Sequence, residues 1–303
     1  MVSELEIHTA LDAQGIHHAE ISHYGDYHNI AYTDGSMVFC KVVRPEFDNK
    51  LANLELSLAG QYGSNVMLTP LHPTTLPVGD TYMSVWRWEP LTTFDAETIS
   101  PEDSVSAAEA LSEIHALPLS ESPVAAMDDL DTFVYNIEQR IEFGNLHGAS
   151  MKGLRTLSLL STKFMERQNV SFDSKLVLNH GDTHIGNLVR RGDSERLSWL
   201  DFEGSKIAPR ELDIATLRVN LDIIGGNHEA WKAAKKSFGQ FDEIDEELLD
   251  ILTRVRLISV TAYGLLRPSE YDLFEQRISI LESMLDTTEI PKSIPKDATP
   301  FTH

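Results

Sequence analysis

Hydrophobic and polar positions in the first part of the chain follow the short alternating runs of a sheet. Apolar runs at residues 30–32 and 37–43 flank the turn-like segment 33–36, which predicts a β-hairpin. Residues 81–88 form another strand-like run after a loop that holds Pro70, Pro73 and Pro77. Between these runs, Leu51, Leu54 and Leu58 lie on one stripe of a predicted helix.

After Glu89-Pro90-Leu91 the periodicity becomes helical. Helices are predicted from residue 101 to about 115, over 131–143 and 151–166, and from 211 to about 285. A small β island, with strands near 176–178, 187–189 and 197–200, interrupts them. The acidic run 242–250 is interpreted as a solvated helix start, and the proline-containing tail from 291 as loose. We therefore expect an N-terminal lobe over 1–88 and a C-terminal lobe over 89–303.

Composition narrows the possible partners. A length of 303 residues exceeds the roughly 250–300 at which single cores divide, which also favours two lobes. The formal net charge of −22 argues against nucleic acid and anionic membranes as main partners, and both parts of the chain are acidic. It suits a cationic substrate or simply a solvated acidic surface. Nothing in the sequence indicates an oligomeric state.

The single cysteine, Cys40, excludes an internal disulfide and a thiolate metal cluster. No apolar run approaches a membrane span, and the first residues lack the pattern of a signal peptide. We therefore expect a cytoplasmic protein in a reducing compartment.

One stretch carries the residue types that phosphoryl transfer requires. An apolar strand leads into a tight loop with His180 and Asp182, and Asn187 follows five positions after Asp182. A short hairpin that turns at residues 192–194 brings Asp201 back beside Asn187. Transfer from a nucleotide needs one carboxylate at the acceptor hydroxyl, and an amide oxygen and a second carboxylate for Mg²⁺.

The spacing of these residues resembles that of kinases. His180 to Asn187 fits the loop pattern H-x-D-x-x-x-x-N, and Asp201-Phe202-Glu203 stands where kinases carry Asp-Phe-Gly. The form His-Gly-Asp-x-His-x-x-Asn, with Pro209 and Asp213-Ile214-Ala215 downstream, is similar to the aminoglycoside phosphotransferase and choline kinase-like family of small-molecule kinases. The resemblance implies an α+β, two-lobed, protein-kinase-like fold. Its small β-rich N-lobe (1–88) would bind the nucleotide, and its larger, mainly helical C-lobe (89–303) would be the catalytic and substrate-binding lobe.

The resemblance also implies roles for single residues. Asp182 would be the catalytic base or the group that orients the hydroxyl, and Asn187 and Asp201 would be magnesium ligands. His180 would brace the loop, and Asp213 would be a structural acid that bonds to the loop backbone.

The N-terminal part should supply the rest of the nucleotide site. Lys41 places a cation on an otherwise apolar strand, where it needs a partner. Glu55 is the candidate, because it lies four residues after Leu51 on the same predicted helix face. The resemblance implies that Lys41 touches the α- and β-phosphates, so that an ion pair with Glu55 would belong to the site.

Two further segments are assigned by the resemblance. Ser22 to Asn29 would cover the phosphates, with Asn29 in the nucleotide site, although Gly25 is its only glycine. Trp86 and Trp88 would mark the hinge whose backbone contacts adenine; the alternative is that these tryptophans are core residues.

Other classes fit less well. A protein kinase needs an activation segment, but only eleven residues separate Asp201 from Asp213, and Gly181 replaces the usual arginine. A metallophosphoesterase would use Asp182-Thr183-His184 and the run 226–229, but after His228 the only histidine is terminal. No Gly-x-x-x-x-Gly-Lys of a P-loop occurs.

The predicted function is therefore transfer of the γ-phosphoryl group of MgATP, with GTP as the alternative nucleotide, to a hydroxyl of a small molecule. An aminoglycoside-like or other amine-bearing acceptor is one expectation, since acidic residues such as Glu270, Asp272 and Glu275 could line its pocket or face water. The alternative function is a catalytically weak pseudokinase or nucleotide-binding scaffold.

Overall fold

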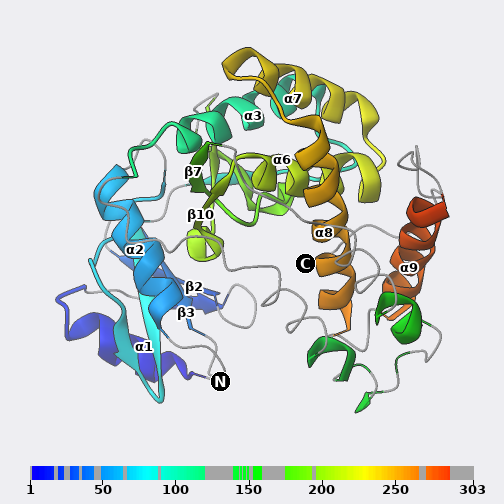
Figure 1. The fold of residues 1–303 in the computed structure, drawn as a ribbon. Helices are drawn as coiled ribbons and strands as arrows, with labels where there is room; N and C mark the ends of the chain where they lie inside the picture. The colour runs from blue at the N-terminus through cyan, green and yellow to red at the C-terminus, as the bar shows by residue number, and fades with distance from the viewer. Residues whose placement is uncertain are drawn as a thin grey trace.

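The computed structural model describes residues 2–16, 20–23, 28–33, 36–43, 49–63, 67–87, 90–119, 139–142, 144, 146–147, 149, 153–158, 175–192, 196–265 and 271–286. The main helices of this part are α1 (Glu4–Asp12), α2 (Lys50–Tyr62), α3 (Pro101–His115), α6 (Glu211–Arg218), α7 (His228–Phe241), α8 (Glu246–Gly264) and α9 (Tyr271–Asp286) (Figure 1). Its strands are β1 (Glu20–His23), β2 (His28–Thr33), β3 (Ser36–Val42), β4 (Leu76–Val78), β5 (Thr81–Arg87), β6 (Leu91–Thr93), β7 (Leu176–Asn179), β8 (Leu188–Arg191), β9 (Leu197–Trp199) and β10 (Lys206–Pro209). Short 3₁₀ turns, η1 (Ile185–Asn187) and η2 (Phe202–Gly204), and the π-helix η3 (Val219–Ile224) lie between them.

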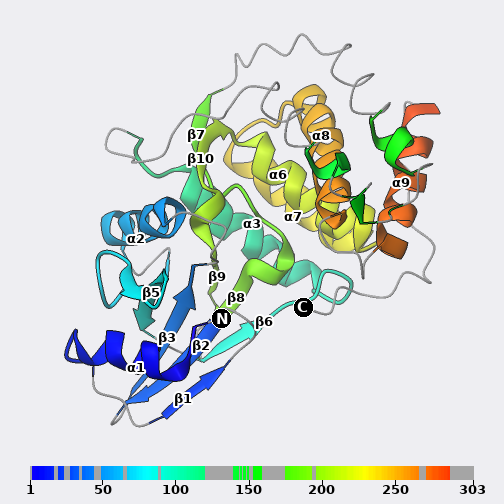
Figure 2. The same cartoon turned by 90° about the horizontal axis from the view of Figure 1, so that it is seen from below.

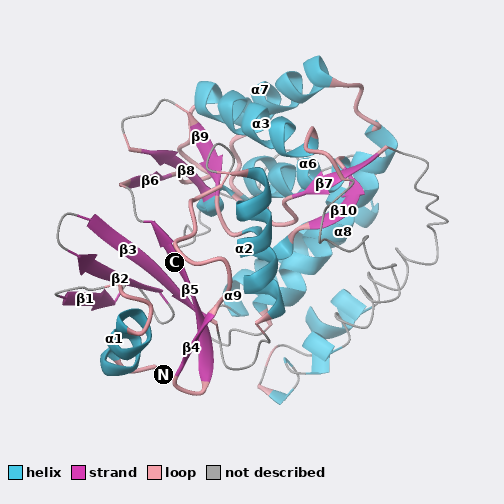
Figure 3. Cartoon of the chain, turned by 90° about the vertical axis from the view of Figure 1, so that its left-hand side faces the viewer, coloured by secondary structure: helices cyan, strands magenta, loops and turns pink. Residues whose placement is uncertain are grey.

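The N-terminal part is an antiparallel sheet in the order β1-β2-β3-β5-β4. Val38, Cys40 and Val42 alternate along β3 and are buried together with Ile7 and Leu11 of α1. Helix α1 therefore covers this face of the sheet, and α2 lies on the side toward the helical part of the molecule (Figure 3). Since Lys41 stands between Cys40 and Val42 on a strand, its side chain leaves the sheet on the α2 side.

The C-terminal part is mainly helical. Helix α3 packs on α7, and α6 packs on α8. Their apolar faces share one core with strand residues that include Leu178 and Trp199. Small antiparallel sheets, β7 with β10 and β6-β8-β9, carry the segments between these helices. The predicted β island is thus confirmed, and it lies where the helical part meets the N-terminal sheet (Figure 2).

The chain leaves the five-stranded sheet after Arg87, and β6 pairs with β8 of the C-terminal part. The described chain is helical at 139–142 and 153–158 within the two intervals predicted as helices, and from 211 to 286 as predicted, with interruptions. The predicted hairpin is confirmed by the register Thr33↔Ser36 between β2 and β3. Glu270 and the tail from 291 lie outside the described residues. None of the described helices has both the length and the apolar character of a membrane span.

The predicted leucine stripe on α2 is partly wrong. Leu58 is buried, but Leu51 is 45% exposed. The buried face instead runs through Ala52, Glu55, Leu56 and Ala59, at spacings of three and four residues. Glu55 therefore points inward as predicted, although Leu51, from which this was inferred, does not.

Candidate active site

The loop from His180 to Asn187 joins β7 to β8 and ends in η1. It presents the polar residues singled out by the sequence. Gly181 has a φ of +84°, and a Cβ atom at this position would lie 1.8 Å from the Gly204 carbonyl oxygen. Only glycine fits such a close approach of two backbone segments. The loop is therefore packed directly on η2, and the glycine that replaces the kinase arginine has a structural reason.

A buried carboxylate holds the start of this loop. The two oxygens of Asp213, on α6, accept the backbone N–H groups of His180 and Gly181, each at 2.8 Å. The His115 ring nitrogen Nε2 is 2.9 Å from the same carboxylate, and the Thr183 hydroxyl donates to the Asp213 carbonyl. Burial alone would raise the pKa of Asp213, but the hydrogen bonds and the charges of the histidines outweigh it and lower this pKa.

The His180 ring braces the loop through both nitrogens. Nε2–H donates to the Leu200 carbonyl at 2.7 Å, and Nδ1 accepts the Asp182 N–H at 3.2 Å. The ring also packs against Phe202, with centroids 4.4 Å apart. Because both nitrogens bond to backbone groups, the geometry supports a structural role for His180.

One carboxylate oxygen of Asp182, the predicted base, accepts a close hydrogen bond, and the other oxygen is more accessible. Its Oδ1 accepts a hydrogen bond from Nη2 of Arg256, on α8, and its Oδ2 is 3.7 Å from Nε2 of His184. The Asn187 side chain donates through Nδ2 to the Asp182 carbonyl at 3.0 Å, which leaves its amide oxygen as an acceptor. The carboxylate, the amide oxygen and the loop backbone are thus fixed relative to one another.

Across from this loop, one ammonium joins three carboxylates. Lys41 Nζ is 2.6 Å from Asp201 Oδ1, 2.9 Å from Glu203 Oε1 and 3.4 Å from Glu55 Oε2. The other oxygen of Glu55 accepts the Phe202 N–H at 3.0 Å. The predicted Lys41–Glu55 ion pair is therefore present, and it connects β3 and α2 to the segment after β9.

Asp201 is placed by an unusual backbone. Its φ of +66° is the only positive value among the non-glycine residues that the structure describes. Such a conformation costs about 1–3 kcal/mol and persists where the surrounding structure imposes it, often at functional sites. The turn aims the Asp201 carboxylate at Lys41, and η2 then brings Glu203 to the same ammonium.

The charges of this cluster shift one another's pKa values. Burial alone would lower the pKa of Lys41, but the carboxylates of Glu55, Asp201 and Glu203 raise it. Burial raises the pKa of Glu55 to about 7, against the opposing effect of Lys41. The pKa of Asp201 is lowered despite burial, because Lys41 is in direct contact with it. The cluster thus keeps its ammonium charged but holds more negative than positive groups.

Comparisons with known proteins identify the family to which the chain belongs. Residues 66–238 match the phosphotransferase enzyme family. The chain belongs to this family. A comparison with curated protein sequences found no match.

Solved structures share the fold of this chain. Choline kinase LicA from Streptococcus pneumoniae has a TM-score of 0.69 and 13% identity, covering 93% of this chain and 100% of that one. A spectinomycin phosphotransferase in complex with ADP and spectinomycin has a TM-score of 0.65 and 16% identity, covering 94% and 99%. The GDP complex of an aminoglycoside 2′-phosphotransferase has a TM-score of 0.64 and 16% identity, covering 93% and 98%. The predicted α+β, kinase-like fold is therefore confirmed.

The chain has oxygen atoms of the kind that bind a hard cation. One oxygen each from Glu55, Asp201 and Glu203 lies within 4.8 Å of the others. Asn187, the other predicted ligand, is held next to this cluster by the Leu200 N–H, which donates to its carbonyl at 2.8 Å. Carboxylate and amide oxygens are ligand types that Mg²⁺ prefers, and in this structure the three carboxylates bind the Lys41 ammonium.

Two residues of this site were missed by sequence reasoning. Glu203 belongs to the Asp-Phe-Glu motif but was not predicted as a ligand. Its position in a tight turn, two residues after Asp201, is a signal that both carboxylates could share a ligand. Arg256 carried no signal, because it lies 74 residues from Asp182 in sequence on a different element.

The described residues give little support for the predicted adenine contacts. The Trp86 side chain is buried in the core, where Nε1 donates to the Ser84 hydroxyl at 2.8 Å. The Arg87 N–H already donates to the Thr69 carbonyl. Trp88 lies outside the described residues, and Asn29 is described only as part of β2, opposite Cys40. The roles of Asn29, Trp86 and Trp88 at the nucleotide stay predictions.

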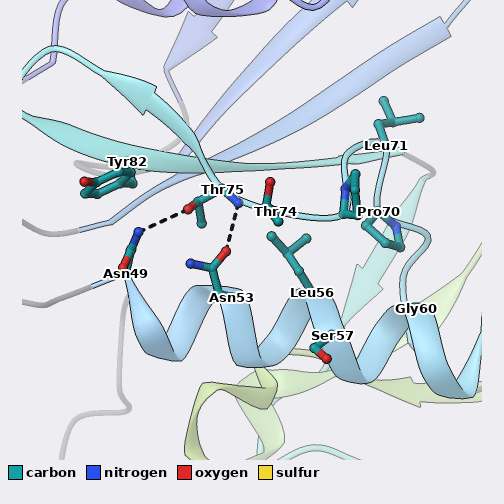
Figure 4. Close-up of a pocket in the computed structure, with 11 residues that line it drawn as sticks. Asn49, Asn53, Leu56, Ser57, Gly60, Pro70, Leu71, Thr74, Thr75 and Tyr82 are labelled. Carbon is teal, nitrogen blue, oxygen red and sulfur yellow. Dashed lines mark hydrogen bonds between the residues drawn. The ribbon is translucent and has the colours of Figure 1, made fainter. Parts of the chain in front are cut away.

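A cavity of about 690 Å³ lies on the other side of α2 (Figure 4). Asn53 and Leu56 point into it from the helix, and Thr75 donates its backbone N–H to the Asn53 side chain at 3.0 Å. Glu55 leaves α2 on the side opposite Asn53, toward Lys41. None of the described residues that line this cavity is charged, so the cavity offers no cation for the phosphates of a nucleoside triphosphate.

Proposed function

We propose that this phosphotransferase moves the γ-phosphoryl group of ATP, with GTP as the alternative donor, to a hydroxyl of a small molecule. The observation that carries the proposal is the convergence of Lys41, Glu55, Asp201 and Glu203 from separate segments beside the loop that holds Asp182. The ADP and GDP complexes of the structural neighbours support a nucleotide as the donor.

On the nucleotide side, Lys41 would bind the phosphates while Glu55 orients its ammonium. Asp201, Asn187 and Glu203 would hold Mg²⁺, which when bound offsets the negative charge of the phosphates. Because Lys41 is held between carboxylates, its charge is maintained without a ligand. Positioning and electrostatics of this kind supply most of the catalysis in phosphoryl transfer.

On the acceptor side, Asp182 would orient the hydroxyl and accept its proton. Its Oδ2 is available for this contact because Arg256 bonds to Oδ1. The backbone bonds to Asp213 and His180 fix the loop, so the carboxylate would need little rearrangement when the acceptor binds.

A small acceptor is favoured over a peptide. The segment between Asp201 and Asp213 is fully described, and it forms η2, β10 and the start of α6. It therefore has no long loop that could act as an activation segment or a peptide platform.

Thermal unfolding tests the nucleotide half of the proposal. A ligand that binds only the folded state raises the melting temperature, so MgATP or MgGTP should stabilise the wild type more than nucleotide without Mg²⁺. Asp201→Ala should lose the magnesium-dependent part. Glu113→Gln is the control, because Glu113 pairs with Arg196 at an exposed position. No stabilisation by either nucleotide would contradict the nucleotide site and argue against the roles of Lys41 and Asp201.

Asp182→Asn tests the catalytic half. We expect turnover to fall by about 10²–10⁴-fold, because the variant cannot accept the hydroxyl proton. Nucleotide stabilisation should persist, since the Lys41 cluster is unchanged. Near-normal turnover in a coupled ADP assay would contradict the role of Asp182.

A further inference from the structure

The charge around Asp182 differs from the charge of the molecule as a whole. The chain has a formal net charge of −22, yet the side chain that contacts this carboxylate from α8 is an arginine. The side chains of Arg256 and Asp182 are 23% and 36% exposed, so a ligand can reach both. The acidic composition suits either a cationic substrate or a solvated surface, whereas the side chain that donates to Oδ1 of Asp182 is itself a cation.

Most of the hydrogen-bonding capacity of Arg256 is unused. A guanidinium has five N–H donors in a planar fork. In the part of the chain that the structure describes, Asp182 is the partner of Arg256, and its Nε is buried without an acceptor. Because the Arg256 side chain is 23% exposed while its Nε is buried, its terminal N–H groups are the ones that an anion beside Asp182 could reach.

A second arginine stands near Arg256. Arg140, in the helical turn 139–142, donates to the carbonyl of Ser259, which lies three residues after Arg256 on α8. Its guanidinium also covers the Tyr263 ring at 5.4 Å. Burial lowers the pKa of Arg140 and the nearby charge of Arg256 lowers it further, while Tyr263 opposes both. Two like charges therefore lie close together on one face of α8.

Other arginines of this region are compensated locally. Arg254 pairs with Asp250 at 2.8 Å, and Arg218 lies between Asp222 and Asp250. Their Nε atoms are unpaired as well, so an unpaired Nε alone does not distinguish Arg256. What distinguishes it is that its carboxylate partner is Asp182, the residue proposed to contact the acceptor. Arg254 is therefore a matched control on the same helix.

We propose that the acceptor carries an anionic group, a carboxylate or a phosphate, near the hydroxyl that is phosphorylated, and that Arg256 binds this group with help from Arg140. The inference rests on the proposed function and specifies its substrate class. Asp182 contributes one negative charge, and the two guanidiniums contribute two positive charges. An amine-bearing acceptor would find Oδ1 of Asp182 already bonded to a cation, whereas an anion would find a fork of charged donors.

Matched compounds of different charge test this inference. Protein saturated with MgADP is titrated calorimetrically with glycerate, glycerol 3-phosphate, glycerol and serinol, and with gluconate, glucose 6-phosphate, glucose and glucosamine. We expect an anionic member of at least one set to bind about tenfold or more tightly than its neutral and amine-bearing counterparts, as for a charged bidentate contact. Whether carboxylate or phosphate members bind distinguishes the two anions.

Variants assign the preference to Arg256. Arg256→Gln should abolish it, Arg256→Lys should keep part of it, and Arg254→Gln should leave it unchanged. Arg256→Gln should also raise the KM of an anionic acceptor more than it lowers kcat, which a merely structural role would not produce. Equal or tighter binding of neutral or amine compounds, no binding of any anion, or an unchanged preference in Arg256→Gln would overturn the inference.

The same samples separate this inference from the proposed function. If MgADP fails to stabilise the protein, the proposed function itself fails. If MgADP stabilises it and an anion preference is absent, only the assignment of the acceptor class fails. Circular dichroism of Arg256→Gln shows whether the variant is folded, and the more conservative Arg256→Lys provides the comparison if it is not.

Discussion

The two sides of the site are stabilised in different ways. On the acceptor side, the loop from His180 to Asn187 is held by N–H groups that converge on the buried Asp213 carboxylate. On the nucleotide side, three carboxylates share the ammonium of Lys41, and Asp201 remains 42% exposed. The first arrangement is a satisfied network of hydrogen bonds, and the second is a cluster with excess negative charge.

The difference matches what each side would have to do. A loop that orients a hydroxyl must keep one geometry, and a buried, fully bonded carboxylate provides it. A site for Mg²⁺ and phosphates must accept new charges, and a partly open cluster with surplus carboxylate oxygens can do so. Disrupting the acceptor side should therefore cost folding stability, whereas changes on the nucleotide side should mainly alter ligand binding.

Gly181→Ala should have the largest effect on stability. A Cβ atom would lie 1.8 Å from the Gly204 carbonyl oxygen, and the φ of +84° is unfavourable for alanine. We expect the free energy of unfolding to fall by at least about 3 kcal/mol, because backbone segments must move apart as well as adopt a strained φ. Urea unfolding measures this change.

Gly226→Ala is the matched control for this variant. Gly226 also has a positive φ, +65°, but nothing lies within 4 Å of a Cβ atom there. Only the conformational cost of about 1 kcal/mol should remain. If the two variants lose equal stability, the close packing of the loop on η2 is not the reason for Gly181.

Asp213→Asn should have the next largest effect, and it should depend on pH. Asparagine keeps one acceptor oxygen where the carboxylate has two, so one N–H group would face an amide N–H instead. We expect a loss of about 2–3 kcal/mol in the free energy of unfolding at pH 7.

The sign of the pH dependence follows from the lowered pKa of Asp213. In the unfolded chain this carboxyl takes up its proton at a higher pH than in the folded protein. Its contribution to stability is therefore present above about pH 4 and is lost as the pH falls through the folded pKa. The difference in the free energy of unfolding between wild type and Asp213→Asn, measured in urea, should narrow as the pH falls below about 4. A constant difference over this range would argue against an ionised Asp213.

The sequence was informative where residues lie close together in a motif. The loop residues, Asp201 and the Lys41–Glu55 pair were predicted because short spacing and an isolated cation on an apolar strand limit what they can contact. Arg256 was not predictable, because the rotation of α8 against the loop depends on packing over the whole C-terminal part. Leu51 was misassigned for a similar reason: its helix could be rotated by one position, and tertiary contacts decided which face is buried.

Glu203→Gln should have the smallest effect on stability. Its carboxylate is 2.9 Å from Lys41, but it also repels Asp201 and Glu55, and its side chain is 31% exposed. The lost attraction and the relieved repulsion oppose each other, so the free energy of unfolding without ligand should change by less than about 1 kcal/mol. The Mg²⁺ concentration needed for half-maximal stabilisation by ADP should nevertheless rise, on the order of tenfold, because one oxygen ligand is lost. Glu113→Gln should change neither quantity. A large loss of stability, or an unchanged Mg²⁺ dependence, would mean that Glu203 supports the fold as Asp213 does, and the contrast between the two sides would not hold.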